Sequence, residues 1–477
     1  MIDNSKNTIL IIGGGILGTV VASELLELGF KVKLFVNKKN IYLDCVETEG
    51  IKINTANIPY SLGGGSNTWS FLSGSLDEEE WQKICKLGYL KNYSYKQFLI
   101  DYNNASKYGF NSFEKVKKLN KVERHKIFYK PLRFYDFRNL LYKRSNLEVI
   151  YGEVGSIFEK NNSVEIFLLN KLKKKSFKGT KLILAAGGLG NFYLISNLDK
   201  SIKKSTYIGH VKGYVATAKI NKKEISKLDL YNYKIRNGMF YYYGFMDKEC
   251  KNYIQLITKK IYETKAFMKA KMFYYSIIND KIYTLKKIFN FCNPNKLPLG
   301  LYSYINRENI FKDLFKLTFD ILFTLPNLFI AILDKKFKFI TDKDRLFFMA
   351  YLTIRGSISI TNSKKLKVKQ KILKKDFNDC ETLLNELSSN LKEKKIITKS
   401  KYEIKRSAFA DANHFMGTTI NFLNREDDGF LKGRLKNFKH IYTVGTSNIW
   451  FETCVNPTLL SLAFAMSTIK DINKKIL

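Results

Sequence analysis

A chain of 477 residues, of which 45% are apolar, can bury a sizeable core and hold two or three ordinary domains. Its 81 Lys and Arg residues against 43 Asp and Glu give a formal net charge of +38, which would attract phosphate, nucleic acid or an anionic membrane surface. Because Lys outnumbers Arg by 70 to 11, whereas nucleic-acid proteins favour Arg forks, we attribute the charge mainly to composition and expect no nucleic-acid partner.

The cysteines and the N-terminus indicate the cellular compartment. The six cysteines are scattered, without a Cys-x-x-Cys pair and without a His at the spacing of a metal ligand. This pattern predicts reduced thiols and no metal site. The first residues run directly into an apolar strand, which leaves no room for a signal peptide. We therefore expect a cytoplasmic protein.

The first predicted elements form a nucleotide-binding unit. Residues 8–12 (TILII) are an apolar run suited to a strand that is covered on both faces. The glycine-rich turn 13–18 (GGGILG) follows at once, then a predicted helix over 16–28 and a second strand over 31–36. A strand, a Gly-x-Gly-x-x-Gly turn, a helix and a strand in this order predict dinucleotide binding.

The three glycines of this turn have different predicted tasks. Gly13 makes the tight turn, Gly15 lets the backbone approach a pyrophosphate, and Gly18 lets the helix pack closely on the strand. The helix starts with Ile16 and Leu17, whose amides would face the anion. These five residues are the predicted pyrophosphate site.

The end of the second strand departs from the usual pattern. An acidic residue usually stands there to bind the ribose hydroxyls, but this chain has Val36 and Asn37. Asn37 can still hydrogen-bond a ribose, whereas the following Lys38 and Lys39 suit the 2′-phosphate of NADP. On this segment alone, FAD and NADP both stay open.

Five further motifs follow along the chain. They are a glycine-rich block at 61–69 (SLGGGSNTW), a buried strand with a glycine turn at 181–191 (KLILAAGGLGN), the block 414–419 (HFMGTT), the strand 441–447 (IYTVGTS) and the helix start 456–463 (NPTLLSLA). Their glycine-rich loops would let backbone amides approach a planar or anionic cofactor. In the last motif, Asn is a good N-cap and Pro a good first helical residue.

Taken together and in this order, the motifs resemble the glucose–methanol–choline (GMC) oxidoreductase family. They are most similar to its branch with a Gly-Gly-x-Ser-x-x-Trp block and a Gly after the C-terminal strand, which includes pyranose oxidase and membrane-linked sugar dehydrogenases. The resemblance covers residues 8–110, 145–215 and 350–472, and residues 216–349 show none. It implies an α/β fold, with a Rossmann-type FAD-binding domain and a discontinuous second domain that binds the substrate.

The resemblance also implies how the two domains divide the chain. The FAD-binding domain would comprise residues 1–90, 145–215 and 430–477, and the substrate or cap domain residues 91–144 and 216–429. Residues 216–349 lean toward helix and are rich in Tyr, Phe and Lys, so we expect them to face the substrate.

FAD is the cofactor that the resemblance implies, bound without a covalent link. Relatives that attach flavin covalently use a His where this chain has Thr68, which cannot form the bond. In addition to the residues of the first turn and the second strand, the implied cofactor contacts are Gly64, Gly65, Ser66, Asn67, Trp69, Val154, Ala186, Gly187, Gly445, Thr446, Asn456, Pro457 and Thr458.

The implied reaction is the oxidation of a CH–OH group, in which hydride leaves carbon for flavin N5 while a base takes the hydroxyl proton. Of the four histidines, His414 lies in the family's His-x-x-Gly-Thr block and is the predicted base, and Asn456 fills the partner position that orients the hydroxyl. His210 resembles a structural segment of the family, and His125 and His440 are expected at the surface. The substrate class is a sugar, a glycan or another secondary alcohol, small or polymeric, and the electron acceptor stays open.

Residues 310–333 predict a helix with one narrow polar stripe on an otherwise apolar surface. Lys316, Asp320 and Pro326 make a transmembrane span unfavourable. Three interpretations remain: a core or contact helix, an interfacial membrane helix, or a lid over the active site. With the lysines at 335–338, the interfacial interpretation places the enzyme peripherally at the inner face of an anionic membrane.

Two rival functions compete with this prediction. Lys38 and Lys39 favour an NADP-dependent Rossmann dehydrogenase, which explains none of the motifs after residue 60. The net charge favours a basic membrane- or nucleic-acid-binding protein on an inactive flavin scaffold, but His414 and Asn456 argue against inactivation.

Overall fold

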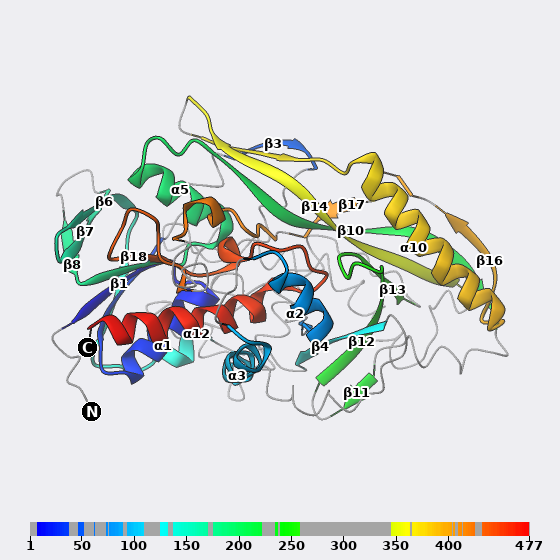
Figure 1. Ribbon diagram of the computed structural model, residues 1–477, viewed down its shortest axis with the longest axis horizontal. Helices are drawn as coiled ribbons and strands as arrows, with labels where there is room; N and C mark the ends of the chain where they lie inside the picture. Colours follow the sequence, from blue (N-terminus) through cyan, green and yellow to red (C-terminus); the bar gives the residue numbers. More distant parts are fainter. Residues whose placement is uncertain are drawn as a thin grey trace, which may run out of the picture.

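Two sheets organise the chain (Figure 1). The computed structural model describes residues 7–37, 46–51, 62, 73–74, 76–88, 93–108, 125–131, 137–169, 175–221, 234–236, 239–257, 345–362, 365–402, 404–405, 409–412, 414–424 and 432–476. Among these residues, a parallel sheet of five strands carries the N-terminal motif, and a larger, mostly antiparallel sheet of ten strands crosses the rest of the molecule.

The parallel sheet is built from the predicted apolar runs. Its strands are, in order across the sheet, β18 (Ile441–Thr443), β9 (Lys181–Leu184), β1 (Thr8–Ile12), β2 (Lys31–Val36) and β5 (Leu147–Tyr151). Every neighbouring pair is parallel, so the carboxyl ends of all five strands meet at one edge. In β1, Ile9, Leu10 and Ile11 are completely buried. The α/β class is confirmed, and the chain turns away from β1 in opposite directions toward β2 and β9, which is where sheets of this kind bind ligands.

Helices and a small sheet cover this parallel sheet. Helices α1 (Ile16–Glu27) and α12 (Pro457–Ile476) lie against each other, as the blue and red helices of Figure 1. The strands β6 (Val154–Lys160), β7 (Ser163–Leu168) and β8 (Ser176–Gly179) form an antiparallel sheet. It packs on the parallel sheet through Phe177, whose ring meets the ring of Phe35 edge-on at 5.2 Å between centroids.

The second sheet is organised around two long strands. β10 (Lys204–Ile220) and β14 (Arg345–Ile360) pair antiparallel from Lys204 opposite Ser359 to Lys219 opposite Arg345. The remaining strands are β3 (Val46–Gly50), β4 (His125–Pro131), β11 (Lys234–Arg236), β12 (Met239–Met246), β13 (Tyr253–Ile257), β15 (Leu366–Gln370), β16 (Ile397–Tyr402) and β17 (Phe409–Asp411).

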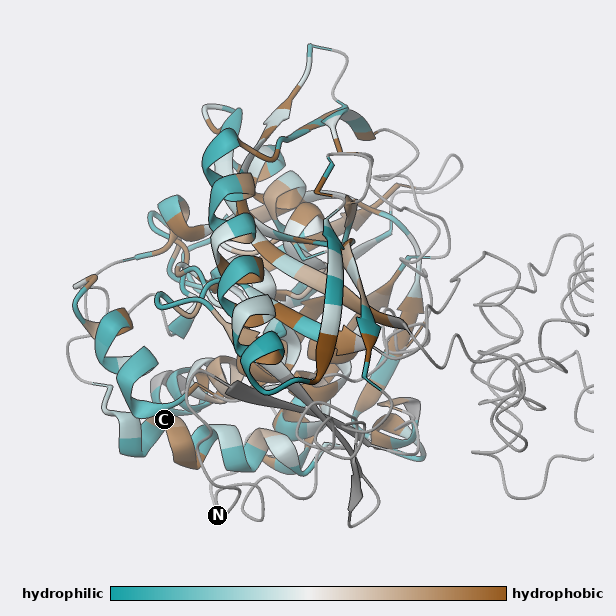
Figure 2. Ribbon diagram, turned by 90° about the vertical axis from the view of Figure 1, so that its right-hand side faces the viewer, coloured by the Kyte–Doolittle hydropathy of each residue, from teal (hydrophilic) through white to brown (hydrophobic). Residues whose placement is uncertain are grey.

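Helix α10 (Lys374–Glu393) covers one end of this sheet. Its buried residues recur every three to four positions, namely Cys380, Leu383, Leu384, Leu387 and Leu391. In Figure 2, which views the molecule from this end, the helix turns hydrophilic residues outward. The buried face and the sheet share one hydrophobic core.

The region 216–349 is not helical where the structure describes it. Its described residues lie mainly in β11, β12, β13 and β14, so the expected lean toward helix is wrong for them. The physical reason is that runs of Tyr and Phe, such as residues 239–246 (MFYYYGFM), suit a pleated surface better than a helix. Residues 258–344, including the predicted helix 310–333, lie outside the described ranges.

The two sheets divide the chain differently from the predicted domains. The expected boundary at residue 215 falls inside β10, which belongs to the second sheet from Lys204 onward. Helix α3 (Tyr95–Ser106), expected in the cap, packs on α12 of the nucleotide-binding part. Phe98 of α3 also stacks on Trp81 of α2 (Glu78–Cys85), at 4.6 Å between ring centroids. Helix α5 (Gly187–Leu198) and 3-10 turns at Phe137–Leu141, Ile420–Phe422 and Thr446–Asn448 complete the described elements.

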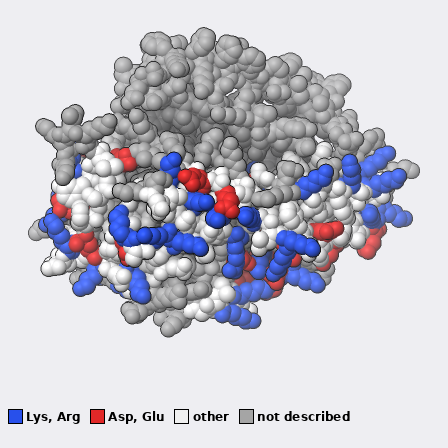
Figure 3. Space-filling model, turned by 90° about the horizontal axis from the view of Figure 1, so that it is seen from above, with Lys and Arg blue, Asp and Glu red and all other residues white. Residues whose placement is uncertain are grey.

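The surface carries the excess of positive charge. Figure 3 shows Lys and Arg spread over the visible face, with fewer Asp and Glu residues among them. Within the described ranges, no helix has the length and apolar character needed to cross a membrane.

Candidate active site

Two glycines of the first turn are required by the fold itself. Gly13 has φ +114°, and a Cβ added there would lie 2.4 Å from the carbonyl oxygen of Ala185 in the neighbouring strand connection. A Cβ added at Gly18 would lie 1.8 Å from the carbonyl oxygen of Gly13. The backbone of α1 therefore touches the turn directly, and a larger residue at Gly18 would push the helix away from the sheet.

Three other glycines open onto unfilled space. No described atom lies within 4 Å of a Cβ added at Gly15, Gly187 or Gly445. Gly187 and Gly445 also have positive φ angles, +75° and +122°. The three residues follow the carboxyl ends of β1, β9 and β18, so they line one edge of the parallel sheet. This edge has the form of a cradle along which a flat or anionic ligand can approach the backbone.

The start of α1 suits a phosphate. Gly15 is the N-cap residue, and among the described residues no side chain caps the helix and no acidic residue stands in its first turn. The first amides, those of Ile16 and Leu17, therefore keep their hydrogen-bonding capacity for an anion, which the helix dipole also favours.

The other predicted cofactor residues divide into two groups. Val36 and Val154 are buried, at 2% and 8% exposed, whereas Asn37 is half-buried beyond the end of β2. The amide of Ala186 donates to Oδ1 of Asn191 at 2.8 Å, which fixes the turn before Gly187. Lys38, Lys39 and the predicted contacts Gly64, Gly65, Ser66, Asn67 and Trp69 lie outside the described residues.

The segment 414–418, which carries the predicted base, is bonded to three elements. Met416 exchanges two backbone hydrogen bonds with Ile208 of β10, each 2.9 Å. The hydroxyl of Thr418 donates to the carbonyl of Gly188 in α5 at 2.7 Å. The amide of Gly417 donates to the carbonyl of Thr446 at 3.0 Å. The loops that supply the open glycines thus also hold the His414 segment.

His414 and His210 form a pair at this segment. Their Nδ1 atoms are 2.8 Å apart, and their rings meet edge to face at 5.0 Å between centroids. Nε2 of His210 is 2.7 Å from the carbonyl oxygen of Thr453. The expectation that His210 is only structural did not foresee this contact. No local signal in the sequence links two residues 204 positions apart.

Burial keeps both imidazoles neutral. It lowers the pKa of His210 to about 4, although the hydrogen bond to Thr453 acts in the opposite direction. Burial, together with the nearby His210 and Lys212, holds the pKa of His414 well below the usual range of histidine. A neutral imidazole is the form that can accept a proton, so the site presents a base at neutral pH.

Asn456 lies three residues after Thr453, immediately before α12. The helix starts at Pro457 as predicted, with Pro457 buried and Thr458 half-buried. Oδ1 of Asn456 is buried and makes no hydrogen bond to any described residue. The expected N-cap bond from this oxygen is therefore wrong. A buried amide oxygen without a partner is costly, which indicates that a bound ligand completes the site.

Comparison with known proteins identifies the fold. No family model matches the chain, and no curated protein matches it. Among solved structures, pyridoxine 4-oxidase from Mesorbium loti is similar over 98% of this chain and 99% of its own, with a TM-score of 0.54 and 10% identity. An FAD-dependent oxidoreductase from Chaetomium thermophilum covers 98% and 99%, with a TM-score of 0.50 and 12% identity. A fungal aryl-alcohol oxidase covers all of both chains, with a TM-score of 0.50 and 11% identity.

These three structures are GMC-type oxidoreductases. The chain has the GMC oxidoreductase fold. The fold that the resemblance implied is thereby confirmed, whereas the pyranose oxidase branch stays a prediction. Within the described residues, no group of His, Cys, Asp and Glu side chains could hold a metal ion.

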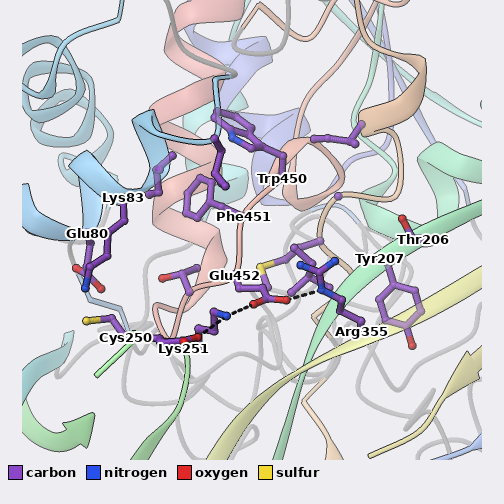
Figure 4. A pocket seen from close by; sticks show the side chains of 18 of the residues that line it. Glu80, Lys83, Thr206, Tyr207, Cys250, Lys251, Arg355, Trp450, Phe451 and Glu452 are labelled. Atoms are coloured by element: carbon purple, nitrogen blue, oxygen red, sulfur yellow. Dashed lines mark hydrogen bonds and ion pairs between the residues drawn. The ribbon is translucent and has the colours of Figure 1, made fainter. Parts of the chain in front are cut away.

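A cavity of about 650 Å³ lies in this scaffold, lined by residues that include Lys251, Arg355 and Glu452 (Figure 4). Thr453 and Met416 line it, whereas His414 and Asn456 are not among its described lining residues. On its wall Glu452 accepts from Lys251 at 2.8 Å and from Arg355 at 2.5 Å. The volume is that of a small-molecule pocket, but its described lining includes Thr453 and neither His210 nor His414.

Proposed function

We propose that the chain is an FAD-dependent oxidoreductase that oxidises the CH–OH group of an alcohol, with His414 as the base. The observation that carries the proposal is the neutral, half-buried imidazole of His414, whose segment is bonded to the loops that contain Gly187 and Gly445. A buried base beside a cofactor-sized cradle is the arrangement that alcohol oxidation needs.

The residues at the cradle fit FAD. The amides of Ile16 and Leu17 would bind the pyrophosphate, since no described side chain caps α1. Gly187 and Gly445 would let the backbone meet the cofactor closely, because a Cβ at either position would project into the cradle. The start of α12 at Pro457 would place its first amides toward the ring system. Bound FAD would supply the acceptor for the hydride that leaves the carbon.

His414 would take the hydroxyl proton. Its pKa lies well below the usual range, so the imidazole is neutral at pH 7 and has a lone pair that can accept a proton. Nε2 makes no hydrogen bond to any described residue and is thus available to a substrate. The amide of Asn456, whose oxygen has no partner, would orient the hydroxyl. A carboxylate base is not needed for this step.

The proposed substrate class rests on the names of similar structures and on the sequence motifs. Two similar structures are, by their names, an oxidase of pyridoxine and an oxidase of aryl alcohols. These names support small-molecule alcohols, with sugars and glycans as the further classes that the sequence motifs imply. Oxygen consumption under turnover would show whether oxygen or a carrier accepts the electrons.

Cofactor identification is the first test. The purified protein should be yellow, with absorbance bands near roughly 370 and 450 nm, and the bands should bleach when a substrate alcohol is added without oxygen. The His414→Ala variant should keep the colour, but the rate of flavin reduction should fall ~10²-fold or more, the scale expected for loss of a positioned base. The Asn456→Ala substitution should slow flavin reduction less than His414→Ala does.

Two outcomes would overturn the proposal. A colourless protein that binds NADP would favour a nicotinamide dehydrogenase, the alternative suggested by Lys38 and Lys39. A His414→Ala variant that reduces its flavin at the wild-type rate would remove His414 from the reaction.

A further inference from the structure

The hydrogen bonds of His210 determine which of its nitrogens carries the proton. Nε2 lies 2.7 Å from the carbonyl oxygen of Thr453, and a carbonyl can only accept. Nε2 of His210 is therefore protonated and donates. Because the pKa of His210 is lowered to about 4, the ring is neutral at pH 7 and holds only this one proton. Its Nδ1 carries a lone pair.

The same argument then fixes His414. Its Nδ1 lies 2.8 Å from Nδ1 of His210, and a lone pair on His210 requires a proton on His414. His414, which is also neutral, thus carries its proton on Nδ1. The lone pair is left on Nε2, the nitrogen that has no hydrogen bond to a described residue.

We propose that His210 is a positioning residue that holds His414 in the tautomer with a free Nε2, so that this nitrogen accepts the substrate proton. The inference rests on the proposed role of His414 as the base. It assigns to His210 the task that a carboxylate has in other histidine-based sites, where a partner orients the ring and selects its tautomer.

The scaffold holds His210 firmly enough for this role. It lies on β10 opposite Thr353 of β14, and only 5% of its surface is exposed. Its carbonyl accepts from the amide of Ala412 at 3.0 Å, two residues before His414. The hydroxyl of Thr353 donates to the carbonyl of Lys251 at 2.5 Å, next to the hairpin that borders the cavity. The backbone of His210 is therefore held between β14 and the segment that leads to His414.

A neutral partner also has a consequence for the charged state. When Nε2 of His414 takes a proton, the ring becomes an imidazolium that still donates from Nδ1 to His210. That hydrogen bond is then charge-assisted and stronger, which offsets part of the cost of placing a cation in a buried site. In the resting state, however, His210 contributes no negative charge, so Nε2 of His414 stays unprotonated.

The tautomer of His414 can be measured directly. The chain has only four histidines, so long-range ¹H–¹⁵N correlation spectra of protein labelled with ¹⁵N-histidine contain few signals. We expect the proton on Nδ1 for His414 and on Nε2 for His210. His440 is an internal reference, because Lys181 donates to its Nδ1 at 2.9 Å and its Nε2 faces the carbonyl of Asn161 at 3.0 Å, which places the proton on Nε2.

Two variants separate positioning from packing. His210→Asn keeps an acceptor close to the place of Nδ1, whereas His210→Leu fills the space without one. The Asn variant should retain the wild-type His414 signal and a flavin reduction rate within ~10-fold, and the Leu variant should lose both, with a slowing of ~10²-fold that approaches that of His414→Ala. The His440 signal should not change in either variant.

A double variant completes the test. If His210 acts through His414, adding His210→Leu to His414→Ala should slow flavin reduction no further, because the residue that it positions is already gone. If the rate effects of the two substitutions multiply instead, His210 has a role that is independent of the base. A wild-type His414 with its proton on Nε2 would overturn the inference whatever the activity. A protein without flavin would overturn the proposed function, while the spectra would still report the tautomer.

Discussion

The Gly15→Ala substitution separates cofactor binding from folding. Gly15 has φ −73° and ψ −171°, an extended backbone that any residue adopts, and no described atom lies within 4 Å of the added Cβ. The new methyl group would therefore project only into the cradle where the pyrophosphate is proposed to bind. We expect a protein that folds normally and binds FAD poorly.

The effects on stability nearly cancel. Replacing Gly by Ala at a compatible position stabilises a protein by ~0.4–1 kcal/mol, because the unfolded chain loses entropy. Gly15 is also the N-cap of α1, where Ala is worse than Gly by about 1 kcal/mol. The free energy of unfolding of the FAD-free protein should thus stay within ~1 kcal/mol of wild type. In the same variant, the Kd for FAD should rise tenfold or more, which corresponds to about 1.4 kcal/mol or more.

Gly18→Ala is the matched control. Its Cβ would lie 1.8 Å from the carbonyl oxygen of Gly13, so backbone must move, and we expect the free energy of unfolding to fall by about 3 kcal/mol. Urea unfolding of the FAD-free proteins measures stability, and quenching of FAD fluorescence measures affinity. If Gly15→Ala binds FAD as tightly as wild type, the cradle is not the pyrophosphate site.

Three further predictions concern the flavin link, acid stability and location. FAD should be released by acid or heat denaturation, because Thr68 cannot form a covalent bond; colour that stays with the precipitated chain would contradict this. As the pH falls from about 6.5 toward 4, His210 is protonated in the unfolded state before it is protonated in the folded state. The free energy of unfolding, measured by urea titration, should therefore drop by about 3 kcal/mol over this range. The His210→Asn substitution should remove this part of the drop. If residues 310–338 bind an anionic leaflet, the protein should float with anionic liposomes at low salt. Flotation should decrease in high salt and in the double variant Phe319→Asp with Phe323→Asp. If the wild type does not bind such liposomes at low salt, the positive charge reflects composition alone.

The local sequence pattern was sufficient to predict the elements of the nucleotide-binding unit. The strands Thr8–Ile12 and Lys31–Val36 have the predicted limits, because an apolar run, a glycine turn and an apolar helix specify them within about thirty residues. The region 216–257 was less readable, since its aromatic residues suit a strand or a helix until their neighbours are known. Here β10, β13 and β14 supply partner strands that no local pattern could reveal.

The site shows the same limit. The prediction of His414 rests on a recognisable block, whereas its contact with His210 could not be predicted, because it joins residues 204 positions apart. For Asn456, the capping rule predicted a bond that the structure does not have. Propensity describes the lowest local free energy, and functional sites are where residues are expected to depart from it.

The proposed cofactor edge and the proposed base, His414, are joined by one set of hydrogen bonds. The 414–418 segment is tied to α5 through Gly188 and to the loop after β18 through Thr446, and both attachments adjoin an open glycine. Its third attachment, to Ile208, belongs to β10, the strand that also carries His210. Positioning of the base relative to the cradle therefore does not depend on a flexible side chain that spans two domains. It depends on backbone bonds to Ile208 and Thr446 and on the bond from the Thr418 hydroxyl to Gly188, which join both sheets at one short segment. This is how the proposed base would keep a fixed place beside the proposed cofactor site.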